Sequence, residues 1–396
     1  MKIKDKNIFK EIALEKHAMW KGKLSIESKA PITNKEELAL AYTPGVAEPC
    51  KAIEKNSELA YKYTGKGNLV AVITDGSAVL GLGNIGPSAG MPVMEGKCAL
   101  FKTFAGIDAI PICVDSYDID EIVNTVYRIS KSFGGINLED ISAPRCFEIE
   151  RRLIEICDIP VFHDDQHGTA IIAGAGIINA LKFTHRPGIR SHGNKIVING
   201  AGAAGISIAR MILKLGLGEV VLCDREGTIY EGAIYNNSEQ KKMAKITNRS
   251  MIKGDLKTAI KGADVFVGVS GPGLLTEDMI KTMAKDPIVF AMANPEPEIY
   301  PDDAIKAGAA VVGTGRSDFP NQVNNVLAFP GIFRGALNCR ADKITEEMKE
   351  AAAIAIADVL PEQELRSDYV LPDPFNRDVV RMVAKAVEEA WKKGEN

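Results

Sequence analysis

A glycine motif in the middle of the chain constrains the fold more than any other feature. Residues 195–199 are a short apolar run rich in β-branched side chains, which predicts a buried strand, and Gly200-x-Gly202-x-x-Gly205 follows directly. Apolar residues at helical spacing come next, and then a second predicted strand that ends at Asp224. This order of strand, turn, helix and strand-terminal acid is the pattern of a dinucleotide-binding unit. It disfavours the alternative of an ordinary glycine-rich turn.

Each part of this motif has an expected physical role. Gly200 permits the tight turn, Gly202 lets the backbone approach a pyrophosphate, and Gly205 lets the helix pack closely against the strand. The first helical residues, from Ala203, offer unpaired N–H groups to the phosphates. Asp224 is expected to accept a hydrogen bond from the 2′-hydroxyl of a ribose. The sequence therefore predicts that the chain binds NAD or NADP.

Asp224 also bears on the choice between these two cofactors. A 2′-phosphate at this position would meet a like charge, which favours NAD. Arg225, the next residue, is the counter-argument, because a guanidinium pairs well with a phosphate. Since Asp224 ends the predicted strand and Arg225 lies in the following loop, NAD is the expected cofactor and NADP the alternative.

Length and composition narrow the class of protein. A chain of 396 residues is too long for one typical core, so two domains are expected. The net charge of −4 and the absence of a long basic block argue against nucleic-acid binding. No apolar stretch is long enough for a membrane span, and the start of the chain lacks the apolar core of a secretory signal. The seven cysteines include no C-x-x-C pair, which indicates buried, reduced thiols in a cytoplasmic protein.

Strand and helix patterns alternate along the chain, which predicts an α/β fold. We expect an N-terminal α/β domain over 1–162, a Rossmann-type domain with a doubly wound parallel sheet over 163–340, and C-terminal helices over 341–396 that pack back across the domain boundary. The expected strands are 68–73, 108–114, 136–141, 159–163, 195–199, 219–223, 263–270, 287–293 and 309–313. The expected helices are 5–20, 34–43, one starting at Lys97, 119–133, 145–157, 166–183, 239–249, one starting in 319–325, 344–359 and 375–392.

Two of the predicted strands each end in a pair of carboxylates, Glu139-Asp140 and Asp164-Asp165. If the strands are neighbours, four carboxylates converge at one edge, where they repel one another unless a cation or protons intervene. A set of oxygen ligands favours Mg²⁺ or Mn²⁺ over zinc. Each pair alone is more often a solvated turn or a helix cap. From the residues alone, the metal site and that alternative both stay open.

Two single residues are ambiguous when taken alone. Tyr42 stands beside a Pro-Gly break at the edge of a loop, where it is either a packing residue or a hydroxyl that faces a cleft. Lys97 stands at the start of a predicted apolar helix, as a surface residue or as a desolvated functional amine. The ordinary packing and surface interpretations are favoured for both when nothing else is considered.

A second G-x-G-x-x-G occurs at residues 81–86, but it does not fit a nucleotide site. Seven residues separate it from the preceding predicted strand, and Pro87 and Pro92 interrupt the segment on its C-terminal side. We interpret this segment as a glycine-rich loop that lines a cleft.

The order of several motifs resembles the malic enzymes, specifically the short bacterial and archaeal type, over most of the chain. The motifs that carry the resemblance are Ala41-Tyr-Thr-Pro-Gly-Val46, Thr74-Asp-Gly76 with the loop 81–86, Gly96-Lys97, Leu138-Glu-Asp140, Phe162-His-Asp-Asp-Gln-His-Gly-Thr169, the Gly200 motif, Asn294-Pro295, and Asn324-Asn325 with Phe329-Pro-Gly331. They are numerous, specific and in the same order as in that family.

The resemblance implies a role for each candidate site residue. It implies that Glu139, Asp140 and Asp165 hold a divalent metal, Mg²⁺ or Mn²⁺, with Asp164 beside it as an acid needed for oxidation. The same resemblance implies roles for four further residues. Lys97 takes the hydroxyl proton, Tyr42 protonates the enolate carbon, and Asn294 and Asn325 contact the substrate carboxylate and the nicotinamide.

The implied reaction is the oxidative decarboxylation of (S)-malate to pyruvate and CO₂ with reduction of NAD(P), by a homodimer or larger homo-oligomer. One departure is Ala78, where larger animal-type members carry an arginine, so another group has to bind that substrate carboxylate. The alternatives are a different metal-dependent hydroxy-acid dehydrogenase, an oxaloacetate decarboxylase, and a nucleotide-sensing module without catalysis.

Overall fold

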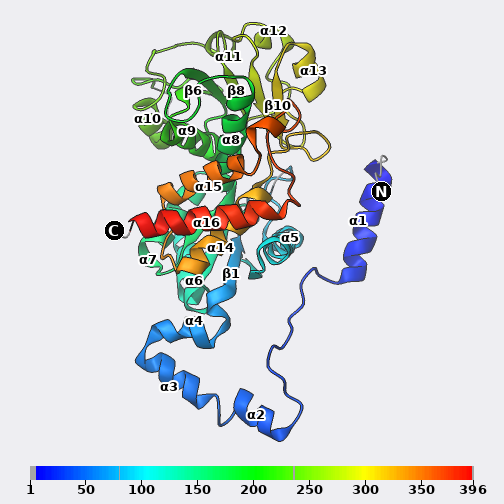
Figure 1. The fold of residues 1–396 in the computed structure, drawn as a ribbon, viewed down its shortest axis with the longest axis vertical. Coiled ribbons are helices and arrows are strands. Elements are labelled where there is room, and N and C mark those ends of the chain that lie inside the picture. Colours follow the sequence, from blue (N-terminus) through cyan, green and yellow to red (C-terminus); the bar gives the residue numbers. More distant parts are fainter. Residues whose placement is uncertain (1–5, 80, 235–236, 395–396) are drawn as a thin grey trace.

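The computed structural model describes residues 6–79, 81–234 and 237–394, and it contains two parallel β-sheets stacked along the long axis of the molecule (Figure 1). Helix α8 (Asp164–Phe183) leaves the edge of the first sheet and packs beside α9 (Ala203–Leu215) of the second. The fold class is therefore the expected α/β.

The first sheet has the strand order β2-β1-β3-β4, and all its pairs are parallel. Alternate residues of β1 enter different cores. Val70 and Val72 pack on the side of α5 and α14, while Ala71 and Ile73 pack on the side of α6 and α7. The sequence of a strand that is buried on both faces is typically a continuous apolar run, and the sequence of β1 has this pattern. The elements are β1 (Leu69–Thr74), α5 (Pro87–Ala105), β2 (Asp108–Cys113), α6 (Ile119–Ile129), β3 (Gly135–Leu138), α7 (Arg145–Ile156) and β4 (Val161–His163).

The second sheet has the strand order β10-β9-β8-β5-β6-β7. Its first five strands are parallel and its two faces belong to separate cores, so the expected doubly wound sheet is confirmed. The two-residue strand β7 pairs antiparallel with β6 and was not expected, because so short a strand leaves no periodic pattern. The elements are β5 (Asn194–Asn199), β6 (Gly218–Asp224), β7 (Gly227–Thr228), α10 (Ser238–Ala244), α11 (Leu256–Ala259), β8 (Val265–Gly268), α12 (Glu277–Ile280), β9 (Ile288–Ala291), α13 (Pro301–Lys306) and β10 (Val311–Thr314).

Three C-terminal helices pack beside the first sheet and α8: α14 (Phe329–Cys339), α15 (Glu346–Asp358) and α16 (Arg377–Gly394). Helix α15 packs on α8, and α16 packs on α14, α15 and α5 (Figure 1). Phe329 and Phe333 of α14 make edge-to-face contacts with Phe101 of α5, with ring centroids 4.7 and 5.3 Å apart. The end of the chain thus completes the core under the first sheet.

Two predicted helix starts are wrong. The helix that carries Lys97 begins at Pro87 and continues through Pro92. The proline removes one helical hydrogen bond, but Met94, Cys98 and Phe101 of the same helix are fully buried in the core. A 3-10 turn (Asn325–Leu327) does begin within the expected window of 319–325, but the α-helix itself begins at Phe329, after residues 321–323 pair with the backbone of Thr314 beside β10.

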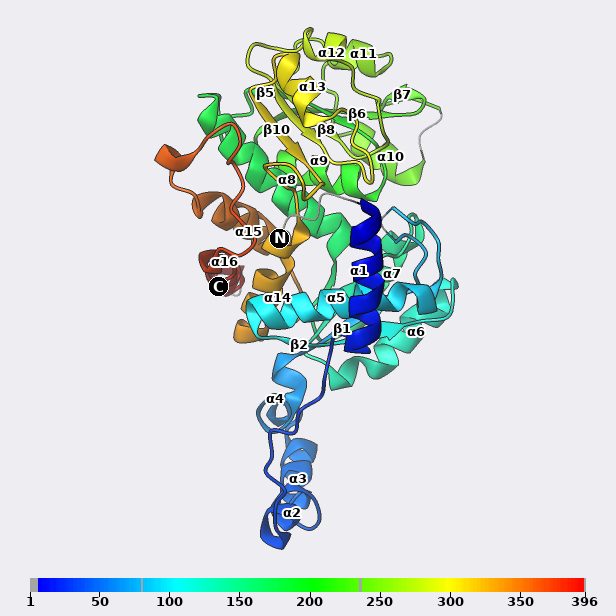
Figure 2. The ribbon, with the colours of Figure 1, turned by 90° about the vertical axis from the view of Figure 1, so that its right-hand side faces the viewer.

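Residues 6–63 form an extended arm (Figures 1 and 2), which touches the body of the molecule where Lys23 donates to the Pro92 carbonyl at 2.8 Å and Lys29 pairs with Asp108 at 3.3 Å. Its helices are α1 (Lys6–Trp20), α2 (Lys35–Ala41), α3 (Ala47–Lys55) and α4 (Ala60–Tyr63). The expected cap of α2 is confirmed, since the Glu37 N–H donates to Asn34 Oδ1 at 2.9 Å. Helices α2 and α3 contain no buried residue. The arm therefore has apolar side chains but no core of its own.

Two further expectations concern cysteines and membrane helices. All seven cysteines are free. Three are buried (Cys98, Cys146 and Cys223) and three are partly buried (Cys113, Cys157 and Cys339), but the expectation of burial is wrong for Cys50, which is exposed on α3 of the arm. Within the described part of the chain, no helix is long and apolar enough to cross a bilayer.

Candidate active site

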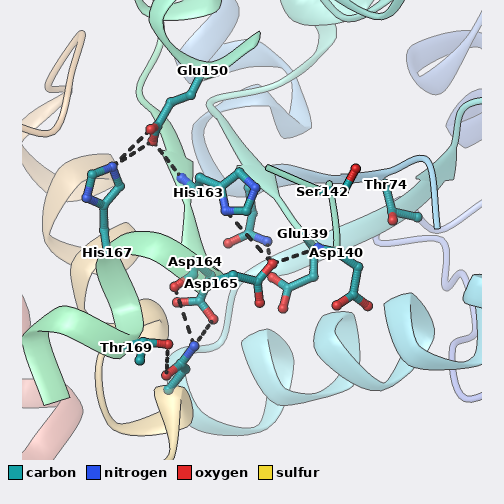
Figure 3. Close-up of polar contacts among 12 residues, drawn as sticks. Thr74, Glu139, Asp140, Ser142, Glu150, His163, Asp164, Asp165, His167 and Thr169 are labelled. Atoms are coloured by element: carbon teal, nitrogen blue, oxygen red, sulfur yellow. Dashed lines mark hydrogen bonds and ion pairs between the residues drawn. The ribbon is translucent and has the colours of Figure 1, made fainter. Parts of the chain in front are cut away.

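The two acidic pairs lie side by side at the carboxyl edge of the first sheet. Strands β3 and β4 are parallel neighbours with Leu138 opposite His163, so the residues that follow each strand meet. Oxygens of Glu139, Asp140 and Asp165 all lie within 4.8 Å of one another (Figure 3). The convergence expected from the sequence is therefore present.

The backbone around Asp140 is bent to hold this arrangement. Asp140 has a φ of 54°, in the left-handed region that aspartate enters more readily than most residues. Its N–H donates to Asp165 Oδ2 at 2.8 Å, and its carbonyl accepts from the Ala78 N–H at 2.9 Å. Strain at a non-glycine residue persists where the surroundings hold it and is common at functional sites.

The donors around the cluster suit a divalent cation. Asp140 Oδ2 is buried and accepts no hydrogen bond, which is costly for a carboxylate oxygen unless a cation contacts it. Burial and the neighbouring Asp165 raise the pKa of Asp140 to about 8, and burial together with Glu139 raises the pKa of Asp165 to about 7. A bound cation reverses such shifts by favouring the charged carboxylates. Three hard oxygen donors fit Mg²⁺ or Mn²⁺.

Lys97 is the cation that the structure places among these acids. Its ammonium lies 3.0 Å from Glu139 Oε2, makes a short contact with Asp164 Oδ2, and sits 3.9 Å from the centre of the Phe329 ring. Burial lowers the pKa of Lys97, but the carboxylates of Asp164 and Glu139 outweigh burial and raise it above its ordinary value. The surface interpretation of Lys97 is wrong, since the residue is only 8% exposed.

Asp164 joins the two halves of the chain at this point. It is fully buried, and burial raises its pKa to about 7 despite the nearby Lys97 ammonium. Asn325 Nδ2 donates to Asp164 Oδ2 at 3.1 Å, and Thr169 Oγ donates to Asn325 Oδ1 at 3.3 Å. Of the two asparagines implied by the resemblance, Asn325 therefore lies in the acidic cluster.

Sequence analysis missed a buried network behind the cluster. Glu150 Oε1 accepts from the His163 N–H at 2.9 Å, and its carboxylate bonds the His167 ring at 3.0 Å (Figure 3). Lys349 of α15 lies 3.2 Å from the same ring. Burial raises the pKa of Glu150, but His167 and Lys349 outweigh it and lower the pKa to about 2. The signal available in the sequence was the pair of histidines that flanks Asp164-Asp165.

The surroundings of the three motif glycines explain why glycine stands at each position. Gly200 follows β5 with a φ of 115°, and a Cβ on Gly205 would stand 1.7 Å from the Gly200 carbonyl oxygen. A Cβ on Gly202, just before α9, would meet no atom within 4 Å, so it would project into open space. That is the space in which the pyrophosphate is expected, with the N-terminus of α9 at Ala203 beside it.

Asp224 and Asn294 stand at the carboxyl edge of the second sheet. Asp224 ends β6 and is exposed, as a group that contacts a ribose has to be. Asn294 follows β9 and is half-buried, with its side chain donating to the Met292 carbonyl at 3.4 Å. Neither side chain contacts the acidic cluster through a bond that the structure records, so their roles toward a ligand stay predictions.

Tyr42 is not brought to the cluster within one chain. It follows α2 near the end of the arm, at a distance from the body of the molecule, and it is 67% exposed (Figures 1 and 2). The packing interpretation is therefore wrong within one chain. The other residues implied by the resemblance lie at the carboxyl edges of the two sheets or on α5.

The glycine-rich loop at 81–86 has no dinucleotide geometry. Gly86 is the residue before α5, and its carbonyl lies against Gly76, where a Cβ would stand 2.2 Å away. Tyr117 donates to Asn84 Oδ1 at 2.9 Å, which ties the loop to the segment after β2. The loop thus lies at the carboxyl edge of the first sheet. Ala78, which precedes the loop, donates its N–H to the Asp140 carbonyl and so links this segment to the acidic cluster.

Comparison with known proteins adds independent information. Residues 21–154 match the family model of the malic enzyme N-terminal domain, and residues 166–391 match that of the malic enzyme NAD binding domain. A bifunctional malic/malolactic enzyme of Bacillus subtilis is 58% identical over 96% of this chain and 92% of its own length. An NAD-dependent malic enzyme of Geobacillus stearothermophilus is 55% identical, over 93% of this chain and 76% of that protein.

Solved structures agree with these matches. The crystal structure of an NAD-dependent malic enzyme from Thermotoga maritima superposes with a TM-score of 0.90 at 48% identity, covering 95% of this chain and 98% of that one. Both domains, their order and the arrangement of the sheets are thus shared. The chain belongs to the malic enzyme family.

Proposed function

We propose that this protein oxidatively decarboxylates (S)-malate to pyruvate and CO₂ and reduces NAD, with Mg²⁺ or Mn²⁺ as the metal. The observation that carries the proposal is the cluster in which Lys97 contacts Glu139 and Asp164 beside the three metal-competent carboxylates. The same chain carries the dinucleotide motif. We further propose the division into 1–162, 163–340 and 341–396, with the cluster at the junction of the first two parts.

Glu139, Asp140 and Asp165 are the residues that would hold the metal. When bound, a divalent cation polarises the oxygens of a hydroxy acid and stabilises the enolate that decarboxylation leaves. Lys97 then has two tasks: its ammonium orients the substrate, and it relays the hydroxyl proton by passing one proton to Asp164, which it contacts, and taking the hydroxyl proton in its place. Asn325 holds the Asp164 side chain in place and faces the same space.

Two other enzymes and one binding module compete with this proposal. Purified protein incubated with malate, Mn²⁺ and NAD is expected to form pyruvate and NADH in equal amounts, and omission of the metal is expected to stop both. NADH without pyruvate would indicate a different hydroxy-acid dehydrogenase, and pyruvate from oxaloacetate alone would indicate a decarboxylase. Cofactor binding without any turnover would support a nucleotide-sensing module.

A second activity is favoured by the relative of Bacillus subtilis, which is named as a bifunctional malic/malolactic enzyme. If this chain has that second activity, pyruvate stays in the site and takes a hydride from NADH and one proton, which gives lactate and restores NAD. The same incubation separates the two activities, because lactate formed without net NADH is a direct product of the second.

Tyr42 is proposed to act in the site of a second copy of the chain, as the acid that protonates C3 of the enolate. Support comes from the arm, where Leu38, Leu40 and Tyr42 are exposed and no buried residue lies on α2. Exposed apolar side chains on an extended segment are typical of an element exchanged between subunits of a dimer. We therefore propose a homodimer, or a larger oligomer built from it.

Subunit mixing tests the position of Tyr42. Tyr42→Phe and Lys97→Met chains are each expected to be nearly inactive, since general acid–base catalysis is typically worth about 10² to 10⁴-fold. If the arm is exchanged, half of the randomly mixed dimers have one intact site, so activity returns to about a quarter of the parent level in a two-fold symmetric dimer. Co-expression followed by a malate assay measures this. No recovery in confirmed mixed dimers would place Tyr42 in its own chain's site or outside catalysis.

Cofactor choice is proposed to favour NAD through Asp224, although the malic enzymes related to this chain include NAD- and NADP-dependent ones. Asp224→Ser removes the charge that opposes a 2′-phosphate, so kcat/KM with NADP is expected to rise while kcat/KM with NAD falls. Steady-state kinetics with both cofactors measures the change. A parent enzyme that prefers NADP, or a serine variant that gains nothing with NADP, would contradict the role given to Asp224.

A further inference from the structure

Gln240, on the short helix α10, makes a contact with Asp224 that the cofactor-binding motif does not predict. Its side-chain amide donates to Asp224 Oδ2 in a short hydrogen bond, and it lies 3.5 Å from the Ala201 carbonyl in the glycine turn. Its own carbonyl oxygen accepts from the Asn237 N–H at 3.0 Å. Gln240 is 6% exposed, so three partners from three segments fix a buried side chain.

Asp224 is held at both of its carboxylate oxygens as a result. Gln240 binds Oδ2, and the Arg225 N–H donates to Oδ1 at 2.8 Å. Each oxygen of a carboxylate accepts two hydrogen bonds, so each still has a free lone pair. The side chain is exposed and would otherwise rotate freely toward solvent. The amide of Gln240 removes that freedom.

We propose that Gln240 is a positioning residue for cofactor specificity, which locks the Asp224 carboxylate toward the ribose and so maintains discrimination between NAD and NADP. The proposal rests on the NAD preference proposed above. A fixed carboxylate offers its remaining lone pairs to a 2′-hydroxyl without losing rotational freedom on binding. It also cannot turn away from a 2′-phosphate, so the repulsion is kept. Because the same Gln240 amide also lies near the Ala201 carbonyl, it links this carboxylate to the glycine turn in which the pyrophosphate is expected.

A purely structural role is the competing explanation, because Gln240 also completes the cap of α10. Asn237 Oδ1 accepts from the Gln240 N–H at 2.9 Å, and the two side chains form a capping box. The cap can be weakened from its other end, since Asn237→Ala removes that bond and leaves the Gln240 side chain unchanged. This variant is the matched control for the stability of the helix.

The test measures direct binding of NADH and NADPH by fluorescence titration at pH 8, without malate or metal. Gln240→Met keeps the length of the side chain and removes the donor. The ratio of the Kd for NADPH to the Kd for NADH is expected to fall about tenfold, the value of one hydrogen bond to a charged group. Asn237→Ala is expected to leave the ratio unchanged. Gln240→Glu keeps the acceptor for the Asn237 N–H but puts a charge beside Asp224, so its Kd for NADH is expected to rise.

The outcomes separate the inference from the proposed function. A parent protein that binds NADPH more tightly overturns the NAD preference. A parent that prefers NADH, with an unchanged ratio in Gln240→Met, overturns the role of Gln240 alone, as does an equal change in Asn237→Ala. Thermal unfolding reports whether Gln240→Met folds. If it does not, Gln240→Glu carries the test because its cap is intact, and unaltered NADH binding in that variant overturns the inference.

Discussion

Asp165→Asn is expected to lower malate turnover by at least about a thousandfold, because stabilisation of the developing charge by a metal is worth several kcal/mol. One carboxylate oxygen each of Asp165, Glu139 and Asp140 lie within 4.8 Å of one another, and Asp165 accepts a hydrogen bond from the Asp140 N–H. An amide at this position removes the charge and weakens the cation site, while the cofactor turn is left intact. Mn²⁺ titration with NADH binding measured in parallel checks both parts.

The control for the change in net charge is Asp358→Asn, a half-exposed carboxylate on α15 that pairs with Lys182. It is expected to keep the metal affinity and turnover of the parent. Unchanged Mn²⁺ affinity in Asp165→Asn would remove Asp165 from the metal ligands. Loss of NADH binding in that variant would show that the substitution damages the fold and not only the site.

The same cluster predicts how the metal-free protein responds to pH. Burial and mutual repulsion raise the pKa of Asp165 from 3.8 to about 7 and that of Asp140 to about 8. The folded state therefore binds more protons than the unfolded state in this range, so the free energy of unfolding falls as the pH rises from about 4 to about 8. Asp165→Asn is expected to flatten this slope, and thermal unfolding over that pH range measures it.

Lys97→Met is expected to reduce kcat by about 10² to 10⁴-fold, the usual contribution of a group that transfers a proton. The methionine keeps the apolar packing on Phe329 but removes the ammonium that contacts Glu139 and Asp164. Lys97→Arg is expected to give little rescue, because a guanidinium stays protonated and has a different shape. Turnover of malate and NADH binding are measured for both variants.

Lys102→Met is the matched control, because Lys102 lies on the same helix α5 but is 60% exposed and pairs with Asp108. It is expected to leave kcat unchanged. Removal of a charge from a buried pair also destabilises, typically by about 3–5 kcal/mol, so Lys97→Met is expected to lower the thermal midpoint without metal. Equal kcat losses in the two lysine variants would contradict a specific role for Lys97.

Some of the site could be predicted from the sequence because its signals are local. Gly200, Gly202 and Gly205 stand in one turn, and the acids follow two strands whose parallel pairing brings their ends together. The predicted strands were therefore sufficient to place the glycine turn and the two acidic pairs. The family resemblance was needed for Lys97, since a lone lysine near an apolar helix has no local signal that distinguishes burial from the surface.

Other parts could not be predicted because they depend on distant segments. Glu150, Lys349 and Gln240 reach the two sites only through the packing of helices whose sequences look ordinary. The start of α5 was misplaced because the tertiary packing of its apolar face outweighs the local effect of Pro92. Tyr42 is the strongest case, since its position depends on an arm that has no core within the chain.

The packing of α14 beneath the first sheet has a consequence for the synthesis of the protein. Phe101 emerges from the ribosome long before Phe329 and Phe333, the rings on which it packs, and the ammonium of Lys97 also rests on Phe329. A nascent chain that ends before residue 329 has every acidic residue of the cluster but an open apolar face behind them. Translation therefore has to pass α14 before Lys97 reaches its buried position, and prematurely terminated chains are expected to be targets for chaperones and proteases and to have no activity.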